Sequence, residues 1–150
     1  MRTWQSIATP LIQKYESFRA DAYLCPAGVW TIGWGSTGTD IRPGMRWTRA
    51  QADARFAQDL DGFGREVAKR VHVPLQPHEM AALVSLVYNI GPANFERSTL
   101  LRVLEAGDKP GAAAQFAVWN KARVKGRLVV LSGLTKRRAH EADVFLGRTP

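Results

Sequence analysis

Two short runs rich in aromatic and β-branched residues, AYLC at 22–25 and VWTIGWG at 29–35, stand between stretches of helical pattern. Such runs favour strands, and the intervening Pro26, Ala27 and Gly28 have the composition of a turn. The two runs therefore predict a β-hairpin. Because an isolated hairpin is only marginally stable in water, it must pack against neighbouring helices. This requirement favours an α+β fold in which a small β element rests on a larger helical body.

Helical patterns lie on both sides of the predicted hairpin. Thr9 followed by Pro10 predicts a helix that opens there and ends just past Glu16. Thr48 begins a T-R-A-Q capping box, and apolar residues recur at three- and four-residue intervals from there to about Val71, which predicts a long second helix. The stretch STGTDIRPGM at 36–45 is full of helix breakers and predicts a loop or a ragged third strand.

The rest of the chain is expected to be helical. A helix over 77–90, stopped by Gly91, has an apolar face suited to the centre of the core. Further helices are predicted from Ser98 or Thr99 to Gly107, from Asp108 to about Trp119, and from about Thr135 to Leu146. We therefore expect one domain over 1–150, with a β-rich lobe at about 18–47 and a helical lobe at about 48–150 that also includes the first helix. A cleft between two such lobes is a natural ligand site.

The charge is strongly positive and unevenly distributed. Lysine and arginine exceed aspartate and glutamate by 21 to 13, a net charge of +8, and 121–148 alone contributes +6 of it. This positive charge predicts attraction to a polyanion. The candidates are an anionic wall polymer, a lipid surface and nucleic acid. Because no helix-turn-helix, RNP-type strand or zinc-finger spacing is present, we expect no nucleic-acid partner.

Cysteine and histidine usage argues against metal and disulfide chemistry. The single Cys25 excludes an internal disulfide and a cysteine-based zinc cluster, and the three histidines form no paired ligand motif. We expect neither a metal nor another cofactor. The first 18 residues hold no apolar run long enough for a signal peptide or a membrane anchor, so synthesis in the cytoplasm is expected. A target beyond the membrane would then require release by a separate protein.

Three polar side chains meet where the first helix gives way to the hairpin: Glu16, Cys25 and Thr31. A glutamate at a helix end is commonly a solvated carboxylate. Here aromatic neighbours predict an apolar, partly dry setting, which favours a carboxyl group that keeps its proton for donation. These neighbours are Tyr15, Phe18, Tyr23 and Trp30.

The same residues resemble a known family, the phage-type lysozymes or endolysins of glycoside hydrolase family 24, related to the T-even phage lysozyme. Glu16, eight intervening residues, Cys25, five intervening residues and Thr31 within WTIGWG carry the resemblance. It continues through ALVSLVYNIG from Ala82, STLLRVLEAGD, FAVWNKA, and GLTKRRAHEADVFL from Gly133. Each motif is weak alone, but the ordered set spans almost the whole chain.

The resemblance implies a lysozyme-like α+β fold, an enzyme used in host cell lysis, and hydrolysis of the β-1,4 bond between N-acetylmuramic acid and N-acetylglucosamine in peptidoglycan. By this analogy Glu16 is the general acid and Thr31 positions the attacking water. Inversion is the implied outcome, and it needs about 6.5 to 9.5 Å between the catalytic groups. A strand residue without a catalytic role is the alternative for Thr31.

Cys25 departs from the family's best-known members, which carry aspartate at this position. A thiol has a pKa of about 8.5 and is mostly neutral at pH 7. Cys25 therefore acts as a thiolate if Arg19 or another cation lowers its pKa, or it is inert and Glu16 does most of the work. Asp21 is a second candidate for the missing carboxylate. Ser36 also departs from the family, in which a histidine often follows this glycine and makes a structural contact.

Further residues match family segments that approach the glycan. Tyr88 and Asn89 are expected to line the cleft, and Ser98 or Thr99 to reach the glycan or to cap a helix. Trp119 and Asn120 match another segment, although core packing is the competing role for Trp119. The basic C-terminal segment suits contact with the anionic wall or with anionic lipid. We expect a monomer.

Two other functions fit the same residues. The first is a lytic transglycosylase, which relies on one glutamate and releases an anhydro sugar. The second is a lysozyme-fold module that binds peptidoglycan without cleaving it, since a fold does not guarantee activity. The presence of both Glu16 and Thr31 at the family spacing argues against the non-catalytic module, whereas Cys25 in place of a carboxylate leaves the transglycosylase open.

Overall fold

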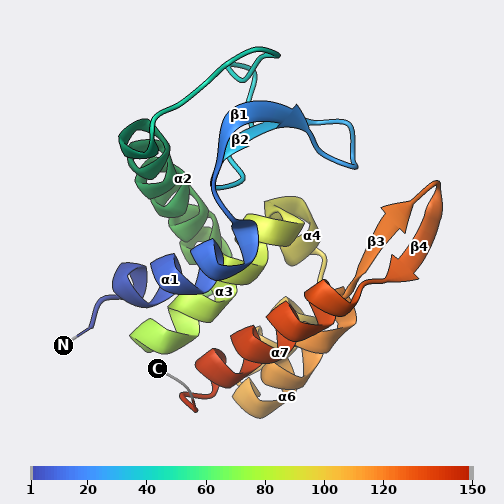
Figure 1. The fold of residues 1–150 in the computed structure, drawn as a ribbon. Coiled ribbons are helices and arrows are strands. Elements are labelled where there is room, and N and C mark those ends of the chain that lie inside the picture. Colours follow the sequence, from blue (N-terminus) through green and yellow to red (C-terminus); the bar gives the residue numbers. More distant parts are fainter. Residues whose placement is uncertain (1, 149–150) are drawn as a thin grey trace.

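The computed structural model describes residues 2–148, which form a helical body with two small antiparallel hairpins (Figure 1). The first half contains α1 (Trp4–Glu16), β1 (Arg19–Leu24), β2 (Trp30–Gly33) and α2 (Arg49–Arg70). The second half contains α3 (Pro77–Ile90), α4 (Pro92–Glu96), α5 (Thr99–Glu105), α6 (Lys109–Gln115), the 3₁₀ helix η1 (Phe116–Trp119), β3 (Lys121–Val124), β4 (Arg127–Val130) and α7 (Ser132–Phe145). The predicted α+β class, with a small β element on a larger helical body, is confirmed.

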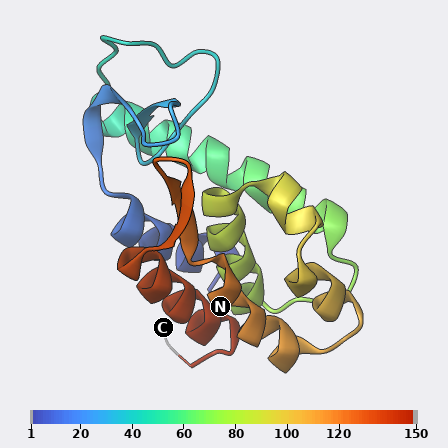
Figure 2. The same ribbon diagram turned by 90° about the vertical axis from the view of Figure 1, so that its right-hand side faces the viewer.

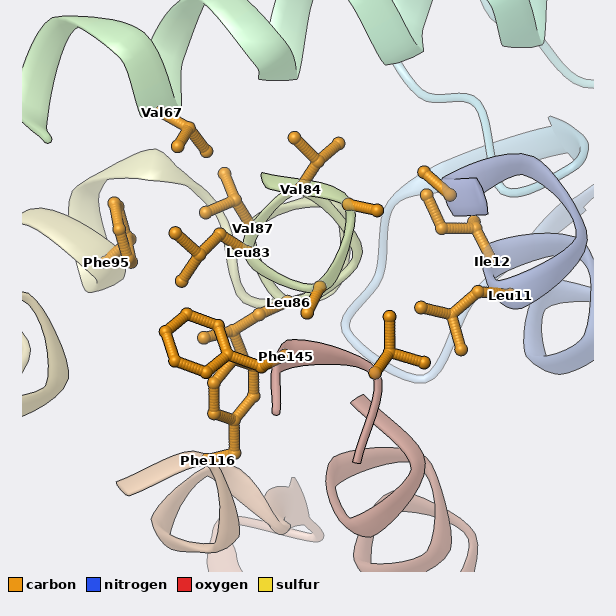
Figure 3. Close-up of a cluster of buried hydrophobic side chains, with 14 of the residues drawn as sticks. Leu11, Ile12, Val67, Leu83, Val84, Leu86, Val87, Phe95, Phe116 and Phe145 are labelled. Carbon is orange, nitrogen blue, oxygen red and sulfur yellow. The ribbon is translucent and has the colours of Figure 1, made fainter. Parts of the chain in front are cut away.

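Helix α3 is the centre of the core, as its apolar sequence predicts. Every residue from Ala81 to Val87 is buried, so the helix has no solvent-facing side over this stretch. Figure 3 shows α3 nearly end-on, with apolar side chains of α1, α2, α4, η1 and α7 directed at it. Among them are Ile12, Val67 and Phe145. The core therefore belongs to the helices, and the β element lies outside it.

The predicted hairpin is formed by β1 and β2, which pair Tyr23 with Thr31 and Leu24 with Trp30. The register is irregular between Arg19 and Tyr23. There the backbone of β1 bonds instead to the segment around Arg46 through a single bridge, so the ragged third strand is one short contact. Ile32 and Trp34 are buried, and Trp34 and Phe18 belong to the core's edge. The helices thus support the hairpin, as its marginal intrinsic stability requires.

Helix α1 begins earlier than predicted. Its N-cap is Thr3, whose hydroxyl accepts a hydrogen bond from the Ser6 N–H, and Pro10 lies inside the helix rather than at its start. The hydroxyl of Thr9 donates to the Gln5 carbonyl, so it makes no cap. The other main caps follow the sequence: Thr48 and Gln51 form the capping box of α2, and Gly91 ends α3.

The second hairpin, β3–β4, lies where the sequence analysis expected only helices and their connections. Its strands pair over four residues each, and Figures 1 and 2 show it projecting from the helical body toward the β1–β2 loop. Helix α7 starts at Ser132, directly after this hairpin, rather than near Thr135. Within residues 2–148, none of the helices combines the length and apolar character needed to cross a bilayer.

Candidate active site

A cleft of about 340 Å³ lies between the β1–β2 hairpin and the helices. It brings together five of the predicted site residues: Glu16, Cys25, Thr31, Tyr88 and Asn89. The remaining lining comes from Tyr23, Gly35, Thr37, Asp59 and Phe63. The chain thus assembles one cavity from the end of α1, the first hairpin, α2 and the end of α3.

Glu16 is the last residue of α1, and the chain turns sharply after it. Ser17 has a φ of 59°, a backbone conformation that a residue with a side chain seldom adopts. This turn ends the helix and directs the chain into β1. The Glu16 side chain retains 18% of its exposure, so it is largely enclosed while still reaching the cleft.

The surroundings of Glu16 are more polar than predicted. Nη1 of Arg137 lies 2.7 Å from Oε2 of Glu16, and the Arg137 side chain is only 4% exposed. The expected setting of aromatic side chains alone is therefore wrong, because a buried cation is the nearest partner. An ion pair of this kind holds the carboxyl group in one orientation.

Arg137 is itself fixed by a buried polar network. Its Nη2 donates to the Ser85 carbonyl at 3.1 Å and its Nε to Glu141 Oε2 at 3.2 Å. Glu141 also accepts from the Ser85 hydroxyl and pairs with Arg138, whose Nε lies 2.7 Å from Oε1. Burial lowers the pKa of Arg138, and the neighbouring Glu141 opposes that shift. A network of three charged side chains, Arg137, Arg138 and Glu141, thus connects Glu16 to α3 and α7.

Gly35 closes the cleft around the other oxygen of Glu16. Its φ is +87°, and a Cβ at this position would lie 2.6 Å from Oε1 of Glu16. The same Cβ would approach Tyr88 Cε1 at 3.6 Å. Only glycine tolerates both the backbone angle and this close approach. The WTIGWG segment therefore forms a wall that fits against the carboxyl group.

Cys25 follows directly after β1 and lines the cleft from the hairpin side. Burial raises the pKa of its thiol, but hydrogen bonds from the backbone of Val29, Ala27 and Gly28 outweigh that effect, so the pKa lies below its ordinary value. The predicted cationic cause is wrong: Arg19 stacks on the Tyr23 ring, 4.2 Å from its centroid. The thiolate is thus stabilised by hydrogen-bond donors.

Thr31 lies on β2 opposite Tyr23, and both residues line the cleft. The Thr31 hydroxyl donates to the Val29 carbonyl at 3.0 Å, which fixes its rotamer. Its lone pairs remain able to accept a hydrogen bond from a water molecule. Burial and the nearby Glu16 charge raise the pKa of Tyr23, so its ring stays neutral.

The helical wall of the cleft holds Tyr88 and Asn89, at the end of α3. The Tyr88 hydroxyl donates to the Trp34 carbonyl at 2.5 Å, which ties the hairpin segment to the helical body. Burial, with the charges of Glu16 and Asp59, raises the pKa of Tyr88. Because its hydroxyl is engaged, Tyr88 offers mainly its ring to a ligand, whereas the exposed Asn89 offers its amide.

Asp59 is the second carboxylate of the cleft and was not among the residues predicted from the sequence. Ser36 donates to its Oδ2 at 2.6 Å and Arg55 Nε to its Oδ1 at 2.9 Å. The buried Ser36 hydroxyl thus makes a structural contact of its own with Asp59 at the position where the family often has histidine. Asp21, the candidate from the sequence, is exposed and pairs with Arg46 at 3.0 Å, outside the cleft.

Three other predicted contacts lie outside this cleft. Ser98 is buried, and its hydroxyl donates to the Phe95 carbonyl and accepts from Leu101 N–H, so it is a helix cap and not a glycan contact. The Asn120 side chain donates to Thr135 Oγ1 at 3.2 Å, at the base of β3–β4. Trp119 packs against the core and lines a separate groove that Asn89 shares.

Arg137 and Gly35 also escaped the sequence analysis. Arg137 lies within GLTKRRAHEADVFL, but only its three-dimensional position distinguishes it from the other cations there. Gly35 lies in WTIGWG, where the second glycine was a detectable signal for a close backbone approach. Within residues 2–148, no three His, Cys, Asp or Glu side chains converge as metal ligands.

Comparison with known proteins gives consistent results over nearly the whole chain. A family model described as Phage lysozyme matches residues 13–141. The endolysin of Acyrthosiphon pisum secondary endosymbiont phage 1 is 42% identical over 135 residues, which cover 90% of this chain and 92% of that protein. The residues matched by the family model include the end of α1, the first hairpin and most of α7.

Two solved structures share the fold. The endolysin from Escherichia coli O157:H7 phage FAHEc1 superposes with a TM-score of 0.85 at 37% identity, covering 95% of this chain and 92% of the other. The muramidase domain of SpmX from Asticaccaulis excentricus superposes with a TM-score of 0.88 at 36% identity, covering 100% of both chains.

Proposed function

The chain belongs to the phage lysozyme family, and we propose that it hydrolyses the β-1,4 bond between N-acetylmuramic acid and N-acetylglucosamine. Membership of this family supports a peptidoglycan-lytic enzyme of the endolysin type. One observation carries the finer proposal: Glu16, held by Arg137, shares a cleft with Cys25 and Thr31. Glycoside hydrolysis needs an acid for the leaving oxygen and a second group on the opposite side of the sugar.

Glu16 is the proposed general acid. Arg137 engages its Oε2, and Oε1 lies against Gly35 at the cleft wall. The proton therefore leaves from Oε1 and passes to the glycosidic oxygen as the bond to the muramic acid C1 breaks. The resulting carboxylate keeps its ion pair with Arg137, which stabilises the charge that forms during the reaction.

Thr31 and Cys25 are proposed to act on the water. The Thr31 hydroxyl, oriented by the Val29 carbonyl, accepts a hydrogen bond from a water molecule placed opposite Glu16. The Cys25 thiolate, stabilised by the backbone donors around it, takes a proton from this water as its oxygen attacks C1. In the alternative, Cys25 is inert and Glu16 is the main catalytic group. Cys25→Ser should then match the wild type.

Product analysis tests the proposal. Purified sacculi digested in H₂¹⁸O should release muramic acid with a reducing end that carries one ¹⁸O atom, and the first anomer observed by NMR should be inverted. An anhydro-muramic product would indicate a lytic transglycosylase. Binding to sacculi without any released product would indicate a non-catalytic module. Either of these two outcomes contradicts the proposed hydrolysis.

We also propose that the protein is made in the host cytoplasm and reaches the wall after a separate protein permeabilises the membrane. The support is membership of a family that includes phage endolysins. Expression in a Gram-negative host without a permeabilising partner should leave culture turbidity unchanged. Addition of chloroform should then cause rapid clearing. Spontaneous lysis of the expressing culture before chloroform would contradict this proposal.

A further inference from the structure

We propose that the β3–β4 hairpin is a docking element for an anionic phospholipid surface. Its two strands are joined by Lys125 and Gly126, with φ angles of 52° and 81°, a two-residue turn typical of tight hairpins. Every residue from 121 to 130 except Ala122 is exposed, and the hairpin stands out from the helical body (Figure 1). Lys121, Arg123 and Leu128 border a groove that Asn89 and Trp119 also line, yet all three side chains remain exposed.

The charge of the hairpin is entirely positive and uncompensated. Lys121, Arg123, Lys125 and Arg127 fall within ten residues, and 109–140 contain no aspartate or glutamate. None of these four cations forms an ion pair within the part of the chain that the structure describes. Arg137 and Arg138 of α7, by contrast, are buried against Glu141. The hairpin therefore presents charge that only an external anion can neutralise.

The same ten residues carry an unusual amount of exposed apolar surface. Val124, Leu128, Val129 and Val130 are 42%, 62%, 39% and 54% exposed. They make up half of the exposed large apolar side chains within residues 2–148. The pairing register places Leu128 opposite Arg123 and Val130 opposite Lys121, while Val129 lies opposite Ala122. Both faces thus combine apolar side chains with cations.

This combination identifies the class of partner. A glycan presents hydroxyl and acetamido groups, and a wall peptide adds charge but no continuous apolar layer. The interface of an anionic bilayer offers both, with headgroup phosphates for the cations and acyl chains for the valine and leucine side chains. The long stems of lysine and arginine also allow their charges to reach headgroups while the strands lie deeper. Lipid docking would hold the enzyme on the membrane beside the wall.

Vesicle binding of the full chain tests this inference directly. Large unilamellar vesicles with 30% phosphatidylglycerol in phosphatidylcholine should bind the protein at least about 100-fold more tightly than pure phosphatidylcholine. A variant with Lys121→Gln, Arg123→Gln, Lys125→Gln and Arg127→Gln should lose about two to three orders of magnitude, at about fivefold per cation. Leu128→Ser with Val130→Ser should lose about tenfold with all charges retained.

A matched variant controls for net charge. Lys14, Arg42, Arg65 and Arg102 are exposed outside the hairpin, and their change to glutamine alters the net charge by the same amount. This variant should bind anionic vesicles within about threefold of the wild type. An equal loss in both variants would show that the total charge alone matters and would overturn the proposal. Hairpin variants that bind vesicles as tightly as the wild type but lose binding to purified sacculi would also overturn the proposal.

Hydrogen exchange on the unaltered protein guards against a variant that fails to fold. The amides of Ala122, Val124 and Val129 should become more protected when anionic vesicles are added, while those of α2 should be unchanged. No gain in hairpin protection would contradict lipid docking even if the protein sediments with vesicles. These readouts are independent of glycan cleavage, so failure of the proposed hydrolase function would leave them interpretable.

Discussion

The Arg137 guanidinium and the Glu16 carboxylate lie 2.7 Å apart although 121 positions separate them in the sequence. Arg137 also donates to the Ser85 carbonyl and to Glu141, so α1, α3 and α7 meet at this one side chain. Helix α1 ends at Glu16 and leads into the hairpin. The contact therefore fixes the candidate acid relative to the helical core.

Arg137→Lys should lower kcat by about tenfold or more and leave KM nearly unchanged. A lysine keeps the charge, but its single ammonium cannot contact Glu16, Glu141 and the Ser85 carbonyl at once. The free energy of unfolding should fall by about 1–3 kcal/mol, because a buried acceptor loses its donor. Steady-state kinetics on soluble peptidoglycan fragments, with urea unfolding, measure both effects.

Arg70→Lys is the matched control, since Arg70 pairs with Glu66 and Glu96 away from the cleft. It should leave kcat within about twofold of the wild type. An Arg137→Lys enzyme with unchanged kcat would show that this ion pair does not position Glu16.

Gly35→Ala should damage the site through one added methyl group. The new Cβ would meet Glu16 Oε1 at 2.6 Å and require a positive φ, so the carboxyl group must move away from Arg137. We expect activity to fall by about 10²-fold or more, the usual effect of misplacing a catalytic group by about 1 Å. Initial rates of sacculus solubilisation measure this loss.

Gly107→Ala separates the backbone strain from the clash. Gly107 has a φ of +88° and no atom within 4 Å of the added Cβ. Its variant should lose about 1–2 kcal/mol of unfolding free energy and keep wild-type activity. Equal activity losses in the two variants would argue against the contact with Glu16.

The Cys25 thiolate predicts a specific pH dependence. Because hydrogen bonds lower the pKa of Cys25 below its ordinary value, the thiolate forms at lower pH than in a free cysteine. Wild-type kcat/KM should therefore show a rising limb that follows this pKa. Cys25→Asp should shift the rising limb to acidic pH, and Cys25→Ser should abolish it with at least about a tenfold loss. If serine matches the wild type at every pH, the thiol has no chemical role.

Glu141→Gln should be strongly destabilising. Glu141 is fully buried and pairs with both Arg137 and Arg138, so removing its charge leaves the buried Arg138 without a counterion and Arg137 with Glu16 alone. The expected loss is about 3–5 kcal/mol, measured by urea unfolding. Asp143→Asn, at a largely exposed pair 4.0 Å from Arg148, should leave stability unchanged. Similar effects of both substitutions would contradict a buried ionic network.

The elements predicted correctly are those set by neighbouring residues. The capping box of Thr48 and Gln51 starts α2, and the apolar segment ended by Gly91 forms α3. The turn at 26–28 lies between β1 and β2. In each case the signal is a local hydrogen bond, a backbone angle or a periodic apolar face, which a sequence displays directly.

The errors occur where local signals compete or are missing. Thr9 before Pro10 imitates a helix start, but Thr3 caps the helix and Pro10 lies within it. The segment KARVKGRLVV alternates polar and apolar residues only over its first four positions, and neither face of the β3–β4 hairpin is buried, so the sequence lacks the sustained alternation of a half-buried strand. Arg137 and Asp59 reach the cleft only through tertiary packing. Such contacts have no local sequence signature.

Initial rates of peptidoglycan solubilisation by wild type and Glu16→Gln test the central claim most directly. Glu96→Gln, at an exposed ion pair on α4, provides the matched control. Loss of the acid should slow Glu16→Gln by about 10²-fold or more, while the control stays at the wild-type rate and both variants remain folded. A Glu16→Gln protein that solubilises the wall at the wild-type rate would contradict the assignment of Glu16 as the general acid.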